Sequence, residues 1–172
     1  MKKIIPILLI ALVISYVSSC EKDDICVDGD TPYLVIGFYN FEDTTAFKRV
    51  STLRVRGIDN DSILDNDSFN DRANSPDSIL VPLRSNNTNT LYEFIKNSND
   101  DSDTGNEIGN IDTLSISYST REAFISRACG FVINYDGVNI ALPESASNWI
   151  QDISVVQSTV ENTNNIHVKI FH

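Results

Sequence analysis

The sequence is poor in the residues that most often carry catalysis. Its 172 residues include two histidines, three cysteines and one tryptophan. It has no G-x-S-x-G or H-E-x-x-H motif and no phosphate- or dinucleotide-binding glycine pattern, and a nucleophile–base pair would need one of the two histidines as its base. His167 alternates with apolar residues, so we expect it to point to solvent, and we expect His172, the final residue, to be mobile. We therefore assign no catalytic residue and predict neither a cofactor nor enzymatic activity.

Positive charge is also scarce. The chain has 13 lysines and arginines against 24 aspartates and glutamates, which gives a formal net charge of −11. Such a surface repels the phosphates of nucleic acids and anionic lipid headgroups at short range. We predict no nucleic-acid partner, and we interpret most of the acidic residues as groups that serve solubility or cation contact.

Long hydrophobic runs are absent except at the N-terminus. Lys2 and Lys3 precede an apolar run from Ile4 to Val17, and small Ser18 and Ser19 follow it. A transmembrane helix needs about 20 apolar residues, so this run is short for a span. A basic start, a short apolar run and small residues are typical of a secretory signal peptide. The alternative is an uncleaved anchor helix.

The end of this leader, "VSSC", carries a more specific signal. With branched Val17 and small Ser19 before Cys20, it resembles the lipobox of bacterial lipoproteins. The resemblance implies that residues 1–19 are a signal peptide and that Cys20 becomes an acylated N-terminus. Two or more acyl chains anchor a protein stably, so the membrane is an expected partner, reached through lipid. Residues 20–30 would be an acidic tether.

Charge follows the cysteine at once, in "EKDD". Lys22, Asp23 and Asp24 resemble the export signal that directs Bacteroidota-type lipoproteins to the outer face of the outer membrane. Ile25 departs from that pattern, because a further acid often stands there. The resemblance implies a lipid-anchored protein of the outer membrane that faces the cell surface. The alternatives are attachment facing the periplasm and a charged stretch that is only a solvated tether.

With Cys20 assigned to lipid, Cys26 and Cys129 remain as a pair. Outside the cytoplasm such a pair is normally oxidised, so we predict a disulfide. In the chain-entropy model, closing a loop of about 100 residues stabilises by up to roughly 4.7 kcal/mol. The alternative is two buried free thiols.

Short apolar runs with a period of two dominate the remaining chain. Such runs bounded by turn residues predict strands, and they occur at Tyr33–Tyr39, Val50–Gly57, Ser78–Leu83, Thr90–Ile95, Asp112–Tyr118, Trp149–Val160 and Ile166–Phe171. Tyr33–Tyr39 has the pattern of a central strand, and Pro82 indicates an edge or a strand end. With the hairpin described next, about eight or nine strands predict one all-β domain over residues 31–172, an antiparallel β-sandwich.

Connections are predicted from turn residues. Asp136-Gly137 stands between apolar runs in "CGFVINYDGVNIAL", which favours a hairpin with a type I′ turn. Asp59–Asp77 and Lys96–Asn110 are rich in Asn, Asp, Ser and Gly, so we expect them to be mobile loops. Pro143–Ile150 could contain a short helix, because proline suits a first helical turn.

Carbohydrate contact is one functional hypothesis. The aromatic residues available for stacking are Tyr39, Phe41, Tyr92 and Trp149, although aromatic residues in a sandwich more often belong to its core. Paired carboxylates could instead hydrolyse glycosides, but no pair stands out among the acidic residues. A small surface hydrolase acting on glycans is therefore the alternative to a binding module.

Calcium is a second hypothesis. Asn99, Asp101 and Asp103 have the alternate spacing with which an EF-hand loop begins, and the acid Glu107 follows them. Thr104 stands where that loop needs glycine, and Asn110 replaces its bidentate glutamate. We treat these three acids as weak candidates for millimolar calcium binding in an adhesion module, and assign no metal site. The alternative is a solvated loop.

A recurring Asp-Ser/Thr-apolar triplet resembles the acceptor site for O-glycosylation of exported Bacteroidota proteins. The acceptors it implies are Ser62, Ser78 and Thr113, with Thr44 as a fourth match. Ser62 and Ser78 lie in or beside the first acidic stretch and are the favoured sites.

The body also resembles a small group of Bacteroidota lipoproteins of unknown activity. The resemblance rests on "TPYLVIGFYN", "ACGF" and "HVKIF", together with the cysteine that follows Cys20. It implies a surface location and a sandwich, but no reaction. We expect a non-catalytic module that binds a glycan or an envelope protein, or that supports envelope assembly.

Overall fold

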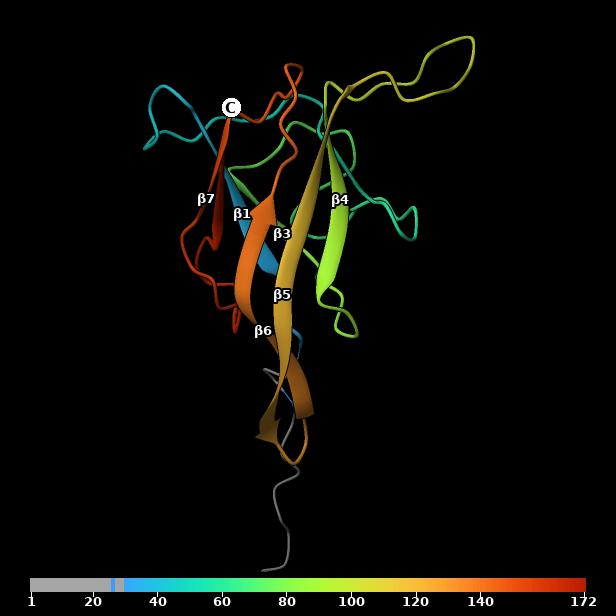
Figure 1. Ribbon diagram of the computed structural model, residues 1–172. Coiled ribbons are helices and arrows are strands. Elements are labelled where there is room, and N and C mark those ends of the chain that lie inside the picture. The colour runs from blue at the N-terminus through green and yellow to red at the C-terminus, as the bar shows by residue number, and fades with distance from the viewer. Residues whose placement is uncertain (1–25, 27–29) are drawn as a thin grey trace, which may run out of the picture.

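The computed structural model describes Cys26 and residues 30–172, which fold into eight strands (Figure 1). The strands are β1 (Leu34–Tyr39), β2 (Arg54–Gly57), β3 (Ser78–Val81), β4 (Asn89–Lys96), β5 (Asn110–Ser126), β6 (Gly130–Ala141), β7 (Asp152–Val155) and β8 (Val168–Phe171). In this part of the chain, no helix has the length and apolar character needed to cross a bilayer.

The strands form two four-stranded sheets, in the orders β3-β1-β8-β7 and β2-β4-β5-β6. Their inner faces enclose one apolar core, to which β1 contributes Leu34, Ile36 and Phe38, and to which β4 and β5 contribute Phe94 and Leu114 among others. Alternation places these side chains, because successive residues of a strand point to opposite faces. The predicted all-β, two-sheet, single-domain fold is confirmed.

One strand pair departs from the antiparallel prediction. β1 lies between β3 and β8, and it pairs with β8 in parallel, with Ile36 opposite Val168. Parallel neighbours need a long crossover, and here the connection is almost the whole domain. This pairing places the C-terminus at the end of the sandwich where β1 ends.

The expectations for both histidines were wrong. His167 is fully buried: its Nδ1 accepts a hydrogen bond from the Val35 N–H at 3.0 Å, and its backbone N–H donates to the Val35 carbonyl at 3.0 Å. His172 is also buried, and its ring packs edge-on against Trp149 with centroids 5.5 Å apart. Both side chains are covered because β8 runs through the interior of its sheet. The backbone pairing therefore overrides local alternation.

The prediction of a hairpin turn at Asp136-Gly137 was also wrong. Residues on both sides of this dipeptide pair with the same strand, Asp136 with Ser119 and Asn139 with Ser117, and the register shifts between the two pairs. The dipeptide is a β-bulge inside β6, where Gly137 has a φ of +66° that suits glycine. The chain reverses instead at the turn of residues 127–129, between β5 and β6.

Four further local predictions differ from the structure. Pro143–Ile150 contains no helix, only irregular chain with a turn at residues 146–147, and the predicted Trp149–Val160 strand is reduced to β7. Likewise only Arg54–Gly57 of the Val50–Gly57 run is a strand. The first acidic stretch, expected to be a mobile loop, contributes Leu64 and Phe69 to the core. These segments are positioned by non-local contacts rather than by their own propensities.

Candidate functional site

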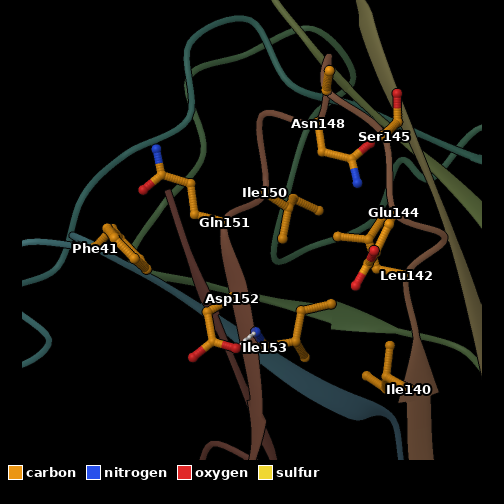
Figure 2. Close-up of a pocket in the computed structure, with 11 residues that line it drawn as sticks. Phe41, Ile140, Leu142, Glu144, Ser145, Asn148, Ile150, Gln151, Asp152 and Ile153 are labelled. Atoms are coloured by element: carbon orange, nitrogen blue, oxygen red, sulfur yellow. Dashed lines mark hydrogen bonds between the residues drawn. The ribbon is translucent and has the colours of Figure 1, made fainter.

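A cleft of about 950 Å³ opens at the end of the sandwich where β6 and β1 end (Figure 2). β6 and β7 are edge strands of the two different sheets, so the cleft forms where the two sheets separate. Phe41 lies on one side of it in this view, and Leu142 and Glu144 lie on the other. The lining residues come from the ends of β6 and β7, from the segment between them, and from the chain after β1: Phe41, Ile140, Leu142, Glu144, Ser145, Ala146, Asn148, Ile150, Gln151, Asp152 and Ile153.

Buried polar contacts position the segment between β6 and β7. The Ile150 N–H donates to Oδ2 of Asp112 at 2.8 Å, and the Trp149 indole N–H donates to the Phe94 carbonyl at 3.0 Å. The Asn148 side-chain amide donates to the Pro143 carbonyl at 2.8 Å. Three contacts thus give shape to a wall that has no regular secondary structure.

Asp112 is an unusual residue for the interior of a sandwich. It is only 1% exposed, and among the described residues its Oδ1 has no hydrogen-bond partner. Burial raises the pKa of this carboxyl, and the backbone N–H groups of Ile150 and Trp149 oppose that rise. Its main contact supports the cleft wall, so we interpret Asp112 as a positioning residue.

The cleft combines an apolar floor with a polar rim. Phe41 is 48% exposed although it is a large apolar residue, and Ile140 and Ile153 lie nearby on the two edge strands. The polar members are carboxylates, amides and a hydroxyl: Glu144, Asp152, Asn148, Gln151 and Ser145. Asp152 Oδ1 accepts the Ile153 N–H at 2.9 Å, so the side chain covers a backbone donor on the edge strand. Apolar contacts with a few convergent polar groups are typical of small-ligand sites.

The aromatic residues named from the sequence separate into two groups. Tyr39, Tyr92 and Trp149 are buried, and the Tyr92 hydroxyl donates to the Pro82 carbonyl at 2.7 Å. Phe41 is the member of the set that faces a cleft.

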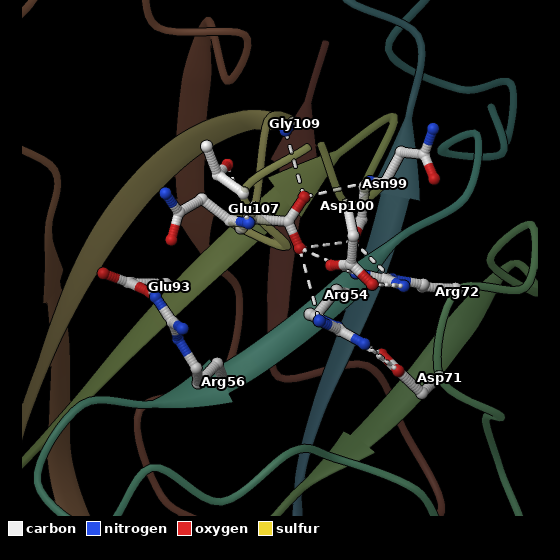
Figure 3. A network of polar contacts seen from close by, with 12 residues as sticks. Arg54, Arg56, Asp71, Arg72, Glu93, Asn99, Asp100, Glu107 and Gly109 are labelled. Carbon is white, nitrogen blue, oxygen red and sulfur yellow. Dashed lines mark hydrogen bonds and ion pairs between the residues drawn. The ribbon is translucent and has the colours of Figure 1, made fainter. Parts of the chain in front are cut away.

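Two of the three weak calcium candidates, Glu107 and Asp101, accept hydrogen bonds from protein groups. Glu107 accepts hydrogen bonds from the Ser98 hydroxyl at 2.7 Å and from Arg54 and Arg72, each at 3.3 Å (Figure 3). Burial alone would raise the pKa of Glu107, but the hydrogen bonds, from Ser98 and from backbone N–H groups first, lower it. Asp101 accepts the Thr104 and Asp103 N–H groups, as in a local turn.

The same network joins the two acidic stretches. Arg54 on β2 contacts Asp71 at 2.6 Å, and Arg72 contacts Asp100. Residues 59–77 and 96–110 are therefore held against the outer face of β2 by shared arginines (Figure 3). Within residue 26 and residues 30–172, no group of three metal-ligating side chains gathers. In this network the carboxylates of Asp71, Asp100 and Glu107 are paired with arginines.

The four O-glycosylation candidates do not lie in one environment. Thr44 and Ser62 are exposed in loops, and Ser62 donates to the Asn60 side chain at 2.9 Å. Ser78 opens β3 and Thr113 lies within β5, and both are partly buried. A modifying enzyme would reach Thr44 and Ser62 more readily than the two strand residues.

The N-terminal predictions concern residues at the limit of the described chain. Cys20, Lys22, Asp23 and Asp24 lie outside the described residues. Cys26 and Cys129 are joined by a disulfide with a sulfur–sulfur distance of 2.00 Å and a Cα–Cα distance of 4.9 Å. The bond ties the N-terminal segment to the turn between β5 and β6.

Apart from Phe41, the cleft residues were not predicted from the sequence. They come from segments that are far apart in the chain and meet only because β6 and β7 occupy neighbouring sheet edges. The sequence did indicate one of the residues that support the cleft. Asp112 lies two residues before Leu114 and four before Ile116 on the same strand, so its side chain falls on the same, buried face. A carboxylate at a core position of a strand indicates a buried polar contact.

Fold and site together define a two-sheet β-sandwich domain with a cleft at one end and a disulfide-linked hairpin at the other. Residues 52–172 match the model of a family described as "Family of unknown function (DUF6452)", and the chain belongs to this family. No curated protein and no solved structure matches the chain.

Proposed function

We propose that this protein is a lipid-anchored module of the bacterial cell surface that binds a glycan in the cleft between β6 and β7 without transforming it. The lipobox-like "VSSC" and the following Lys22-Asp23-Asp24 support the location. The observation that carries the binding function is Phe41, an exposed aromatic ring beside a rim of carboxylates and amides.

The chemistry of the cleft suits a sugar. One face of a pyranose ring presents C–H groups, which pack on an aromatic ring, while its hydroxyls need both donors and acceptors. Phe41 offers the apolar surface, Asn148 and Gln151 offer both donors and acceptors, and Glu144 offers acceptors. Neither histidine lines the cleft, because both are buried in the interior.

The position of the cleft also fits display from a membrane. Figure 1 shows the β5–β6 hairpin and the C-terminus at opposite ends of the domain. The disulfide to Cys26 joins the hairpin turn, whereas the cleft residues lie around the end of β6 and the chain after β1. If Cys20 carries the acyl chains, the cleft faces away from the membrane and is open to ligands from outside.

The binding proposal is tested by glycan-array and affinity-electrophoresis measurements on the folded domain. Phe41→Ala should remove retention by the glycans that the parent binds, because it removes the stacking surface. Phe47→Ala is a matched control, since Phe47 is equally exposed at 48% but lies outside the cleft. Retention that is absent in the parent, or equally lost in both variants, contradicts binding in this cleft.

A small glycoside hydrolase is the second candidate, and one observation favours it. Glu144 and Asp152 both line the cleft, and paired carboxylates are what glycoside hydrolysis requires. Release of reducing ends from a bound glycan, lost in both Glu144→Gln and Asp152→Asn, would establish hydrolysis. Retention without release supports the binding module.

The location is tested separately in intact cells by metabolic acyl labelling and protease shaving. Changing Lys22, Asp23 and Asp24 to alanine should leave acylation intact and remove surface exposure, because acylation depends on residues before Cys20 and export on charge after it. Cys20→Ser should remove the acyl label. Shaving of the alanine variant to the same extent as the parent would contradict the export signal.

A further inference from the structure

The hairpin between β5 and β6 extends beyond the sandwich as a narrow arm (Figure 1). β4 pairs with β5 only as far as Ser117, so that beyond this residue β5 pairs with β6 alone. We define the arm as residues 119–134, which lie beyond the core residues Tyr118 and Tyr135. A two-stranded ribbon offers little core of its own, and the side chains near its turn are correspondingly exposed.

The end of the arm is apolar. Phe124 and Phe131 are cross-strand partners whose rings pack edge-to-face with centroids 5.3 Å apart, and they are 59% and 66% exposed. Phe131 is the most exposed large apolar side chain of the described residues. Ile125, in the register shift next to Phe124, adds a third such side chain at 42%. We call these three residues together with Arg127 the arm tip.

The charge of the arm tip differs from that of the chain. The chain carries 24 acidic residues, yet residues 123–135 include none, and their one charged residue is the exposed Arg127 in the turn. Arginine among apolar side chains can reach lipid phosphate oxygens while its stem lies on apolar surface. The arm tip itself thus carries no acidic group, and the acids that flank Cys26 in the sequence belong to the tether.

The arm tip is also the part of the domain linked to the proposed anchor. Cys129, in the turn, is bonded to Cys26. At roughly 3.3–3.6 Å per residue, the stretch from Cys20 to Cys26 spans at most about 22 Å. An acyl group on Cys20 would therefore hold the arm tip close to the bilayer that the acyl chains enter.

We infer that the arm tip is a membrane-contact surface, with Phe124, Ile125 and Phe131 in the lipid interface and Arg127 at the phosphates. This inference rests on the proposed lipid anchor for its setting. Exposed apolar groups of this kind mark membrane or protein contacts. A stable protein interface buries about 800 Å² per partner, more than three side chains at the end of a ribbon provide, so lipid is the favoured occupant.

The test uses a tryptophan in the arm tip as a depth probe. The test protein begins at Glu21, has a hexahistidine tag in place of residues 1–20, and carries the substitution Phe131→Trp. The tag holds this protein on phosphatidylcholine vesicles that contain nickel-chelating lipid. The vesicles are prepared with and without bromine on the acyl chains, which quenches tryptophan only on contact. The native Trp149 is buried at the cleft end and serves as an internal reference. Phe47→Trp is the matched control, since it places an exposed tryptophan beside Tyr39, at the end where β1 finishes.

We expect a blue shift and strong bromine quenching for Phe131→Trp, and neither for Phe47→Trp. Equal emission from Phe131→Trp on brominated and plain vesicles overturns the inference. A blue shift that rises with protein concentration without vesicles would show an interface between copies and also overturn it. Because the tag replaces Cys20, the result does not depend on natural acylation. Absence of acyl labelling in cells would remove the anchor proposal alone.

Discussion

The two ends of this sandwich are built by different means. At the arm end, two strands leave the body and carry exposed apolar side chains, and a disulfide joins the turn to the N-terminal segment. At the cleft end, a segment without regular structure is held by hydrogen bonds to the buried groups of Asp112 and Phe94. A ribbon with few neighbours gains little from packing, so a covalent bond is the stronger means of holding it. A wall that borders the core can be held by polar contacts.

The difference has a functional consequence. The arm tip presents an apolar surface with a single cation, whereas the cleft presents an aromatic ring with a mixed polar rim. The first suits a lipid interface and the second suits a hydroxyl-rich ligand. If both proposals hold, the domain would separate attachment from recognition by placing them at opposite ends of the same strands, β5 and β6.

The largest effect is expected from breaking the arm end. Replacing both Cys26 and Cys129 by serine should lower the free energy of unfolding by about 2–5 kcal/mol, because the loop closed in the unfolded chain is long. Denaturant titration measures the loss, and the reduced parent protein should unfold at the same midpoint as the variant. Glycan retention by the folded fraction should not change, since the cleft lies at the other end. Equal midpoints for oxidised parent and variant would contradict the expectation.

The second-largest effect on stability is expected at the cleft end, from the loss of the Asp112 carboxylate. Asp112→Ala should lower the free energy of unfolding by about 1–3 kcal/mol, because it leaves the buried Ile150 N–H without its acceptor. Asp112→Asn keeps an acceptor and removes a buried charge, so it should be less destabilising and should retain glycan binding that the alanine variant weakens. Equal affinities in both variants would show that Asp112 does not position the cleft.

Asp112 also predicts a pH dependence. Burial raises its pKa in the folded state above the ordinary value of 3.8, so the folded chain binds a proton that the unfolded chain releases. The contribution of this group to stability therefore falls as pH rises from that value through the folded pKa. Asp112→Asn should lack this decline in unfolding measurements over the acidic range. A decline of the same size in parent and variant would assign it to other groups.

A smaller effect concerns the interior between the two ends. Burial lowers the pKa of His167 below its ordinary value of 6.5, so the unfolded chain binds a proton that the folded chain excludes. Stability should fall as pH drops through 6.5 towards the folded pKa, because a proton on Nδ1 removes the acceptor for the Val35 N–H. His167→Asn retains an acceptor without titrating, so its melting temperature should fall less on acidification. His172, whose pKa is lowered in the same direction by burial, should leave a residual fall in the variant.

The smallest effect tests how the arm is held to the body. Arg121 contacts Asp136 at 2.8 Å and Glu161 at 2.5 Å, and its side chain is 46% exposed. Exposed ion pairs contribute little and are screened by salt. Arg121→Ala should therefore change the unfolding midpoint only slightly, and the change should vanish in high salt. A loss comparable with that of the disulfide variant would show that this ion pair, rather than the covalent bond, holds the arm.

The local pattern of the chain determined the composition of its layers. The alternation of Leu114, Ile116 and Tyr118 predicts a half-buried strand, and the continuous apolar run of β1 predicts a central one, because both depend only on which face of a strand meets the core. The pairing of Cys26 with Cys129 follows from the number of cysteines once Cys20 is assigned elsewhere. Each of these inferences needs information from a few neighbouring residues or from a count.

Only the tertiary structure decided which strands and side chains lie next to one another. His167 is buried because β8 pairs in parallel with β1, and Asp136-Gly137 forms a bulge because both of its sides pair with β5. The cleft exists because β6 and β7 are edges of different sheets, and the arm tip is exposed because β4 ends its pairing before β5 does. The physical reason is the same in each case. The free energy of these arrangements comes from contacts between residues that are distant in the chain, and local propensity contains no information about such contacts.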